Sequence, residues 1–589
     1  MKRRLFALAL ALLLAVSLPV SALAGKWFID DGDIIINATE NGQPVKQGDK
    51  DAVEDAAPVI KQRDGSTTTD KTIKIETTGD ATADVTIENV NIKSSGDAID
   101  VGSSSADITL KGDNKIFSEN GSALHVSSGD VTIDGDGSLE AGSKNNDNNH
   151  AAIGSRENEA MSGSITIGGS AKVTAVSRDD GAGIGSGDMG EMSGDITIGD
   201  NAQVTAWSGT GGAGIGSGRE NDVSGTITIG GNAQVTAGSN SETAGIGSGN
   251  NGSITSAGRI IIRDSAKVTA IGEDEGAGIG TGEDELMAGM IIIQDNAQVT
   301  AIAGDHAAAI GSDNQNEMTG TILILGNARI TTGILLDDDV SFDYTTKEIK
   351  YTLNENAIGY IGDSKYSNHE SDYGHYVIGP DVTINGISGS NIDELKQYVN
   401  MRLNSNGEPE NLTRLDIRSE NGKFTVDASG EGKVEKILYG GSETVPTAPG
   451  TYPVTCVVRL GNGTTLEFQI GTFIVPEPPA EAAQPAPVYH VTDKDGNAVS
   501  YTAAREGGVL TIRVDAAYAR LTLTADEAQA LTAQGVEKVV FVTTGATSAF
   551  RPADLTAYKD EAPFVLTHDG ETVTFTAGKT DLASLLVQA

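Results

Sequence analysis

Clusters of carboxylates are the residues in this sequence whose chemistry is easiest to name. They are Asp179 and Asp180, then Glu273, Asp274 and Glu275, then Glu283, Asp284 and Glu285. Carboxylate oxygens are the ligands that Ca²⁺ prefers, and a lyase acting on uronates would add an Arg or Lys to take a proton from the sugar. Neighbouring copies of these segments carry Gly, Ser or Thr, so we interpret the clusters as a solvated acidic ridge, with calcium binding as the alternative and catalysis as the third reading.

A second set of residues could hydrogen-bond an extended ligand. These polar residues recur at a fixed spacing and are Lys172, Gln203, Gln234, Lys267, Gln298 and Arg329. Exposed aromatic rings would add stacking surfaces for sugars, and the candidates are Trp207, Tyr360, Tyr366 and Tyr373. The alternative for both sets is ordinary solvent-facing strand residues and packing within an irregular cap.

The elements that carry these residues repeat along the chain. Six copies of a unit run from about 151 to 332, and three apolar columns move through them in steps of 31 residues, with one insertion of two residues near Asn250. The first column contains Ile184, Ile215 and Ile246, the second is an Ile-Thr-Ile stretch, and the third is a Val-Thr-Ala stretch. Three columns that move together indicate one structural unit per step.

Each stretch alternates apolar with polar residues, which is the period of a strand with one buried face. Three short strands per unit cannot bury their apolar faces alone, so the units must stack, each strand pairing with its equivalent in the next. The sequence therefore predicts an all-β fold, a right-handed parallel β-helix with Ile184, Ile215 and Ile246 above one another. The second column continues upstream of Ile165 through Val131, Ile108 and Val85.

This repeat framework is similar to secreted β-helix carbohydrate-binding proteins of clostridia and their relatives. The resemblance rests on the segments 85–87, 107–110 and 130–139. The Gly-Ala-Gly-Ile-Gly-Ser-Gly runs, as at 181–187, resemble Gram-positive surface proteins, and the turn at 446–452 resembles the Ig-like modules of such proteins. The resemblance implies an exported, non-catalytic protein and supplies no ligand-binding residues.

Composition excludes several classes. Of 589 residues, 82 are acidic and 41 basic, and the formal charge of −41 makes binding to nucleic acid by phosphate contacts improbable. A single cysteine, Cys456, excludes an intramolecular disulfide framework, and we expect it to be a buried small apolar residue. Residues 1–24 have the basic, apolar and small-residue order of a secretory signal, which predicts a secreted or cell-envelope-associated protein with no membrane insertion of the mature chain.

Changes in pattern divide the chain into segments. We expect a signal peptide at 1–24, an N-terminal cap and irregular coils at 25–84, β-helix repeats at 85–335, and a Tyr-rich cap with a short helix at 336–405. An Ig-like module at 406–475, a Pro/Ala linker at 476–487 and a β-rich module at 488–589 follow. In the last module, Thr524 and Glu527 predict a capping box at the start of a helix that runs to Gln534.

The hypothesis that these observations favour is a non-catalytic binding or adhesion protein. A rigid β-helix would display a polar face, with polysaccharide as the first ligand class and a host or bacterial surface protein as the second. No cofactor is required, and Ca²⁺ is the candidate if one is used. Two alternatives remain open, a calcium-dependent polysaccharide lyase or hydrolase and a purely structural surface-layer or stalk protein.

Overall fold

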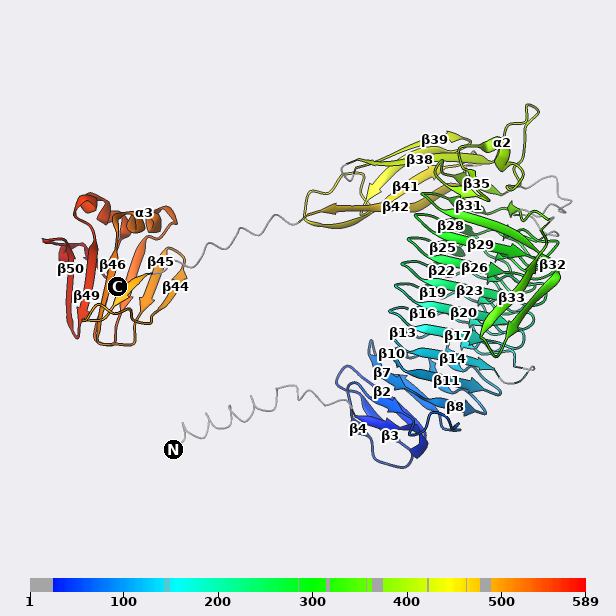
Figure 1. Ribbon diagram of the computed structural model, residues 1–589, viewed down its shortest axis with the longest axis horizontal. Helices are drawn as coiled ribbons and strands as arrows, with labels where there is room; N and C mark the ends of the chain where they lie inside the picture. The colour runs from blue at the N-terminus through cyan, green and yellow to red at the C-terminus, as the bar shows by residue number, and fades with distance from the viewer. Residues whose placement is uncertain are drawn as a thin grey trace. The chain divides into compact units, whose positions relative to one another are not determined.

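The structure is a computed structural model that describes residues 25–588, apart from residues 144, 146–147, 284, 314–317, 356, 363–373, 421–422, 462 and 477–488; for residue 338 the backbone alone is described. The signal-like segment 1–24 and most of the predicted linker therefore lie outside the described residues. The chain forms two compact units, Met1–Val475 and Pro476–Ala589, and each is described by itself (Figure 1).

Three large sheets make up most of the first unit. In hydrogen-bonded order, sheet 1 contains β1 (Lys26–Phe28), β5 (Val59–Lys61), β7 (Thr82–Glu88), β10 (Ser105–Lys111), β13 (Val131–Gly135), β16 (Ser164–Ile167), β19 (Asp195–Ile198), β22 (Thr226–Ile229), β25 (Arg259–Ile262), β28 (Met290–Ile293), β31 (Thr321–Ile324), β35 (His375–Ile378), β38 (Leu412–Glu420) and β39 (Lys423–Gly430). Sheet 2 contains β37 (Ile387–Ser388), β36 (Thr383–Ile384), β32 (Arg329–Asp343), β29 (Gln298–Ala303), β26 (Lys267–Ile271), β23 (Gln234–Ser239), β20 (Gln203–Ser208), β17 (Lys172–Val176), β14 (Ser138–Ser143), β11 (Asp113–Ser118) and β8 (Asn91–Ser94), and β33 (Glu348–Leu353) pairs with β32. Sheet 3 contains β34 (Ile361–Gly362), β30 (Ile310–Gly311), β27 (Ile279–Gly280), β24 (Ile246–Gly247), β21 (Ile215–Gly216), β18 (Ile184–Gly185), β15 (Ile153–Gly154), β12 (Leu124–Val126), β9 (Ile99–Gly102), β6 (Ile73–Thr77), β2 (Ile34–Ala38), β3 (Pro44–Gln47) and β4 (Val53–Glu54).

Each 31-residue repeat gives one strand to each sheet, and we call one such pass through the three sheets a rung. Successive rungs pair in parallel and in register, and Figure 1 shows the strands from β13 to β31 stacked one beside the next. Ile184 pairs with Ile215 and Ile215 with Ile246, and all three side chains are fully buried. The predicted stacking of this column and the all-β class are confirmed, because equivalent apolar residues from every rung fill one common core.

The upstream column differs from the prediction by two residues. Val131 pairs with Ala106 and with Ile165, whereas Ile108 pairs with Ile133. Val131 and Ile133 lie on the same face of β13 and both are buried. Alternation of apolar and polar residues fixes which face of a strand is buried, but a shift of two residues leaves that face unchanged.

A glycine ends the sheet 3 strand of each 31-residue rung, where the chain turns. Gly185, Gly216 and Gly247 have φ values of 142°, 143° and 139°. A residue with a Cβ is strained in this region of φ, so the requirement for glycine at this corner is conformational. The repeated Gly-Ile-Gly pattern thus marks a corner between sheet 3 and the loop that follows it.

The last rungs of sheet 1 are covered on their outward face. β38 extends sheet 1 in parallel with β35 and pairs antiparallel with β39, and a separate sheet contains β40 (Lys433–Tyr439), β41 (Gly450–Arg459) and β42 (Thr465–Val475). Cys456 and Phe468 from this small sheet pack with Ile292 and Leu323. Earlier rungs carry Thr at this outward position, as at Thr197 and Thr228. The segment 406–475 belongs to the same compact unit as the repeats.

A hairpin of β32 and β33 lies across the outward face of sheet 2. Its apolar side chains Val340, Phe342 and Ile349 cover outward-facing residues near the ends of the sheet 2 strands. Near its turn, Lys347 forms an ion pair with Glu140, which belongs to β14. The short helix α2 (Ile392–Leu395) lies within the segment 336–405 for which a short helix was predicted, and the side chain of Asn391 accepts a hydrogen bond from the backbone N–H of Glu394. A short 3₁₀ helix, Ile29–Asp31, follows β1.

The second unit contains two five-stranded sheets. One has the order β43 (His490–Thr492), β46 (Tyr518–Leu523), β49 (Phe564–Asp569), β50 (Thr572–Ala577) and β51 (Thr580–Asp581), and the other β44 (Thr502–Glu506), β45 (Val509–Arg513), β47 (Lys538–Val542), β48 (Thr547–Phe550) and β52 (Leu586–Val587). Helix α3 (Ala525–Ala533) carries the predicted capping box of Thr524 and Glu527. Two 3₁₀ helices, Pro552–Glu561 and Ala583–Leu585, complete the unit.

Candidate functional site

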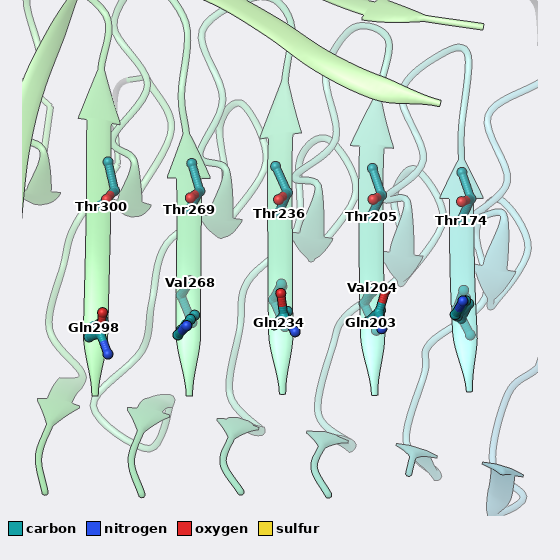
Figure 2. Close-up of a pocket in the computed structure, with 14 residues that line it drawn as sticks. Thr174, Gln203, Val204, Thr205, Gln234, Thr236, Val268, Thr269, Gln298 and Thr300 are labelled. Atoms are coloured by element: carbon teal, nitrogen blue, oxygen red, sulfur yellow. The ribbon is translucent and has the colours of Figure 1, made fainter. Parts of the chain in front are cut away.

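An open groove runs along the outward face of sheet 2, and we call it the Gln–Thr groove (Figure 2). Its volume is about 520 Å³. One side chain from the start of each of five neighbouring strands forms the rim row, which contains Lys172, Gln203, Gln234, Lys267 and Gln298. The residue two positions later on each strand forms the threonine row, which contains Thr174, Thr205, Thr236, Thr269 and Thr300.

In-register pairing produces the two rows. Gln203 pairs with Gln234 and Thr205 with Thr236, and the same relation holds from β17 to β29. Residues two apart on a strand point to the same face, so both rows face outward, while Val204 between them is buried. Figure 2 shows the labelled threonines aligned from strand to strand, with the labelled glutamines nearer the start of each strand.

The side chains of the groove are available to a ligand. The rim residues are exposed and the threonines are half-buried. Among the described residues, none of these ten side chains is engaged in an ion pair or a side-chain hydrogen bond. Five of the predicted binding residues therefore lie together, and Arg329 pairs with Gln298 on the next strand. Gln298 and Arg329 also line a neighbouring hollow of about 350 Å³, together with Asp381.

The prediction that Trp207 is an exposed stacking surface is wrong. Trp207 faces outward from β20 but is 4% exposed, because the β32–β33 hairpin covers it. Its ring stacks on that of Phe342, with 6.2 Å between the ring centroids. Ile271 and Ile302 occupy the same outward position on later strands and lie under the same hairpin. Each sheet 2 strand of the groove thus presents an exposed polar residue, then a threonine, and then a position at or near the hairpin.

Of the predicted tyrosines, Tyr360 is half-buried, whereas Tyr366 and Tyr373 lie outside the described residues. Tyr344 and Tyr351 of the hairpin are 43% and 38% exposed. The guanidinium of Arg178 lies over the Tyr344 ring, 4.1 Å from its centroid. Neither ring lines the Gln–Thr groove. The groove therefore offers hydroxyl, amide and ammonium groups and no described aromatic surface.

The first predicted carboxylate cluster has a protein cation beside it. Asp180 accepts from Arg219, with 3.1 Å between Oδ2 and Nη1. The hydroxyl of Thr210 lies 2.9 Å from a carboxylate oxygen of Asp179 and 2.9 Å from one of Asp180, and it can donate to either. On the other side of Arg219, its Nε lies 3.5 Å from Oδ1 of Asp188. A guanidinium at this position supplies the positive charge that a calcium ion would otherwise bring. The arrangement is that of a partly buried ion-pair network around one arginine.

The other predicted carboxylates lie on later rungs. Glu283 accepts from the amide of Asn250 at 3.3 Å, and Asp284 lies outside the described residues. Glu285 accepts from the hydroxyl of Ser253, Glu273 accepts from the backbone N–H of Ser241, and Glu275 is half-buried. The strands β17 and β26 that precede the first two clusters are three strands apart, or about 14 Å at ~4.8 Å per strand. The predicted carboxylates thus fall into separate local groups.

Asp274 lies in a group with two residues that the sequence interpretation did not single out. Ligand atoms of Asp274, Asp305 and His306 lie within 4.8 Å of one another, on consecutive rungs. Ca²⁺ takes oxygen ligands, whereas an imidazole with two carboxylates suits Zn²⁺ or another borderline metal better. Asp305 is exposed and the other two are half-buried. The group therefore identifies residues that could hold a cation without indicating calcium.

The sequence interpretation missed a buried network around His125. Its Nδ1 lies 2.7 Å from Oδ1 of Asp100 and its Nε2 lies 2.7 Å from Oε2 of Glu159, and the side chain is 3% exposed. Burial alone would lower the pKa of His125, but the hydrogen bond to Asp100, nearby Asp97 and the bond to Glu159 outweigh it and raise the pKa. Arg156 donates to Asp97 at 3.1 Å from Nε. The network joins the shorter upstream rungs to the first long loop.

A signal for this network exists in the sequence. His125 and Asp100 occupy the sheet 3 position that is glycine in later rungs, since His125 pairs with both Asp100 and Gly154. Ligand atoms of Asp97, Asp100 and His125 lie within 4.8 Å of one another. The Arg156 guanidinium, whose Nη2 also approaches Asp100 at 3.7 Å, already occupies the cationic position beside these carboxylates. The network is therefore satisfied by protein groups.

Asp188 is a second buried titratable group outside the groove. Its side chain is fully buried, and neither carboxylate oxygen has a hydrogen-bond partner among the described residues. Burial raises its pKa to about 6, although Arg219 opposes the shift. A carboxylate with a raised pKa could move a proton, but Asp188 lies outside the groove and is closed to solvent. Its raised pKa predicts that the stability of the protein depends on pH through Asp188.

The groove and the buried networks have different chemistry. Among the described residues that line the Gln–Thr groove, none is a carboxylate, a histidine or a cysteine, and the titratable side chains there are those of Lys172 and Lys267. The titratable networks at His125 and Asp188 are formed by other residues, and the side chains of His125 and Asp188 themselves are buried. The groove is a surface for hydrogen bonds and for ionic contacts from its lysines.

Within the described residues, no helix has the length and apolar character needed to cross a membrane. No protein-family model matches the sequence, and neither the curated proteins nor the solved structures contain a significant match.

Proposed function

We propose that this chain is an exported, non-catalytic polysaccharide-binding protein built on a right-handed parallel β-helix. One polysaccharide chain would lie in the Gln–Thr groove along the direction in which the rungs stack. The observation that carries the proposal is the pair of unbroken rows, each repeating one hydrogen-bonding side chain per rung over five rungs. A polymer of similar units fits such a periodic surface better than a compact small molecule does.

The chemistry of the rows supports a hydroxyl-rich ligand. Glutamine amides and threonine hydroxyls both donate and accept hydrogen bonds, so they can satisfy sugar hydroxyls in either orientation. The rungs repeat at ~4.8 Å, which is comparable with the length of one sugar residue in an extended chain. In-register strands also hold the backbone of the rows rigid, which reduces the ordering cost of binding.

Matched variants of the full chain test this proposal. The groove variant is Gln203→Ala/Gln234→Ala, and the control is Thr197→Ala/Thr228→Ala on the half-exposed outward face of sheet 1. Each lost hydrogen bond is worth ~0.5–1.5 kcal/mol, so two should weaken affinity about tenfold. Affinity electrophoresis in gels that contain single polysaccharides, together with pull-down on insoluble glycans, measures the change.

We expect the groove variant to lose retention and the control variant to keep it, with unchanged melting temperatures for both. Failure of the wild type to bind any polysaccharide of a broad panel would instead support the structural stalk alternative. Release of unsaturated sugars from pectic substrates with Ca²⁺ would support the lyase alternative. Equal losses in the two variants would contradict the location of the site.

A further inference from the structure

The rim of the Gln–Thr groove is basic in a strongly acidic protein. The whole chain has a formal charge of −41, yet Lys172, Lys267 and Arg329 stand in one row with glutamines between them. Among the described residues, no carboxylate forms an ion pair with any of the three, and none of the residues that line the groove is acidic. The row is therefore a local region of positive charge that a ligand could neutralise.

Cations elsewhere on sheet 2 are paired. The Nζ of Lys93 lies 2.9 Å from a carboxylate oxygen of Glu119. Glu140 forms ion pairs with Lys115, at 3.8 Å, and with Lys347. The change from paired to unpaired cations coincides with the start of the groove at β17. A protein with twice as many acidic as basic residues has ample carboxylates to pair these cations, so their unpaired state is a property of this row.

Three aspartates in the turns before sheet 2 strands are engaged by the backbone. Asp264 accepts from the N–H of Gly231 at 2.9 Å, and Asp295 accepts from the N–H of Asp264 at 3.1 Å. Asp200 accepts from the N–H of Gly169 at 2.9 Å. These carboxylates fix the turns before the sheet 2 strands. One acidic side chain, Asp381, lines the neighbouring hollow at the Arg329 end.

The spacing of the cations sets the charge density of a matching ligand. Lys172 and Lys267 are three strands apart, or about 14 Å, and Lys267 and Arg329 are two strands apart, or about 10 Å. Double-stranded DNA carries one negative charge per ~1.7 Å, which is far denser than this row. A glycan with an acidic group on some of its sugar residues matches the row, with the glutamines meeting uncharged positions.

The absence of described aromatic groups in the groove favours the same class of ligand. Neutral glycans are commonly held by stacking on exposed rings, and Trp207, the outward aromatic residue of these strands, is covered by the hairpin. Binding must then come from hydrogen bonds and charge. We propose that the ligand of the Gln–Thr groove is an acidic polysaccharide, bearing carboxylate or sulfate groups that meet Lys172, Lys267 and Arg329. This inference rests on the proposed function.

The test compares polymers that differ in charge alone. Polygalacturonate and its fully methyl-esterified form share one backbone, and chondroitin sulfate and desulfated chondroitin form a second pair that separates sulfate from carboxylate recognition. Binding of the full chain is measured by biolayer interferometry with a chelator present, so that a metal cannot bridge the partners. Measurements at about 0.05 M and about 0.5 M NaCl report the ionic part, because salt screens exposed charges. Double-stranded DNA is included as a denser polyanion.

The charge variant is Lys172→Gln/Lys267→Gln/Arg329→Gln. Its control, Lys494→Gln/Arg513→Gln/Lys579→Gln, removes the same three charges from exposed positions of the second unit. We expect the charge variant to lose at least tenfold in affinity for polygalacturonate. The wild type should bind the neutral, methyl-esterified polymer at least tenfold more weakly than polygalacturonate, and its affinity for polygalacturonate should fall by a similar factor at high salt. The control should retain wild-type affinity.

Outcomes that refute the inference are distinct from failure of the proposed function. Equal, salt-insensitive binding of the acidic and neutral forms would overturn the acidic class while leaving a polysaccharide site in place. Tighter binding of DNA than of any glycan would overturn the inference in favour of a dense polyanion. Binding to no polysaccharide at all would remove both proposals.

Discussion

The glycine corner of sheet 3 gives the sharpest test of the stacked rungs. Gly216 has a φ of 143°, and a Cβ at this position would overlap the carbonyl oxygen of Gly247 on the next rung. We expect Gly216→Ala to destabilise the first unit, because the backbone must leave a conformation that alanine tolerates poorly and the two rungs must also separate. Backbone strain costs ~1–3 kcal/mol and overpacking a further ~1–3 kcal/mol, so the expected loss is about 4 kcal/mol.

Gly199→Ala is the matched control. This glycine follows β19, and a Cβ there would have no heavy atom within 4 Å. Its substitution should change stability by about 1 kcal/mol or less in either direction. The two variants therefore differ in the contact between rungs, although each adds one methyl group.

Differential scanning calorimetry of the full chain measures the difference. For a unit of this size, a loss of about 4 kcal/mol lowers the melting temperature by about 4 °C. The second unit provides an internal standard, because its own transition should not move. Equal melting temperatures for Gly216→Ala and Gly199→Ala would refute the close stacking of glycines at this corner.

Four further predictions concern buried groups. His125→Gln should lower the free energy of unfolding by about 2 kcal/mol between about pH 5 and pH 6.5. This loss should shrink as pH rises through the raised pKa of His125, because an imidazolium bound by two carboxylates stabilises the fold only while it is protonated. Urea unfolding across this pH range measures the change. Asp188→Asn should stabilise the protein at pH 8 by up to about 3 kcal/mol and should have little effect near pH 4. The reason is that the pKa of Asp188 is raised from 3.8 to about 6, so the ionised wild-type side chain becomes unfavourable as pH rises. A variant less stable than the wild type at pH 8 would contradict this. Trp207→Ala should cost about 3–5 kcal/mol and expose the β32–β33 hairpin to limited proteolysis, whereas an unchanged digestion pattern would argue against its packing on Phe342. Cys456, whose pKa burial raises to about 12, should react with a thiol reagent in the unfolded protein and remain unreactive in the native protein.

The repeat pattern was sufficient to predict the stacking of strands and the rim row. Lys172, Gln203, Gln234, Lys267 and Gln298 recur in step with the buried columns, and in-register pairing turns that periodicity directly into a row. The two-residue error at Val131 arose because Val131 and Ile133 of β13 are both buried on one face. The alternation of apolar and polar residues does not indicate which of the two pairs with Ile108.

What covers an outward face could not be predicted from the strand itself. Trp207 alternates outward as expected, but the side chains that bury it come from residues 340–349, more than a hundred positions later. The covering of Ile292 and Leu323 by the small sheet has the same origin, although apolar residues at outward positions were a usable signal there. The His125 network depends on three separate rungs, and its signal is a histidine where later rungs have glycine.

The β32–β33 hairpin has a consequence for how such a protein can change in length. It starts from β32 and contacts β14 through Lys347 and Glu140, and these two strands are six positions apart in sheet 2. Duplication of one 31-residue repeat within this span would displace Glu140 from Lys347 by about one strand spacing, ~4.8 Å. The length of the hairpin therefore has to match the number of strands between β32 and β14. We expect the number of repeats and the length of the hairpin to vary together during evolution or engineering.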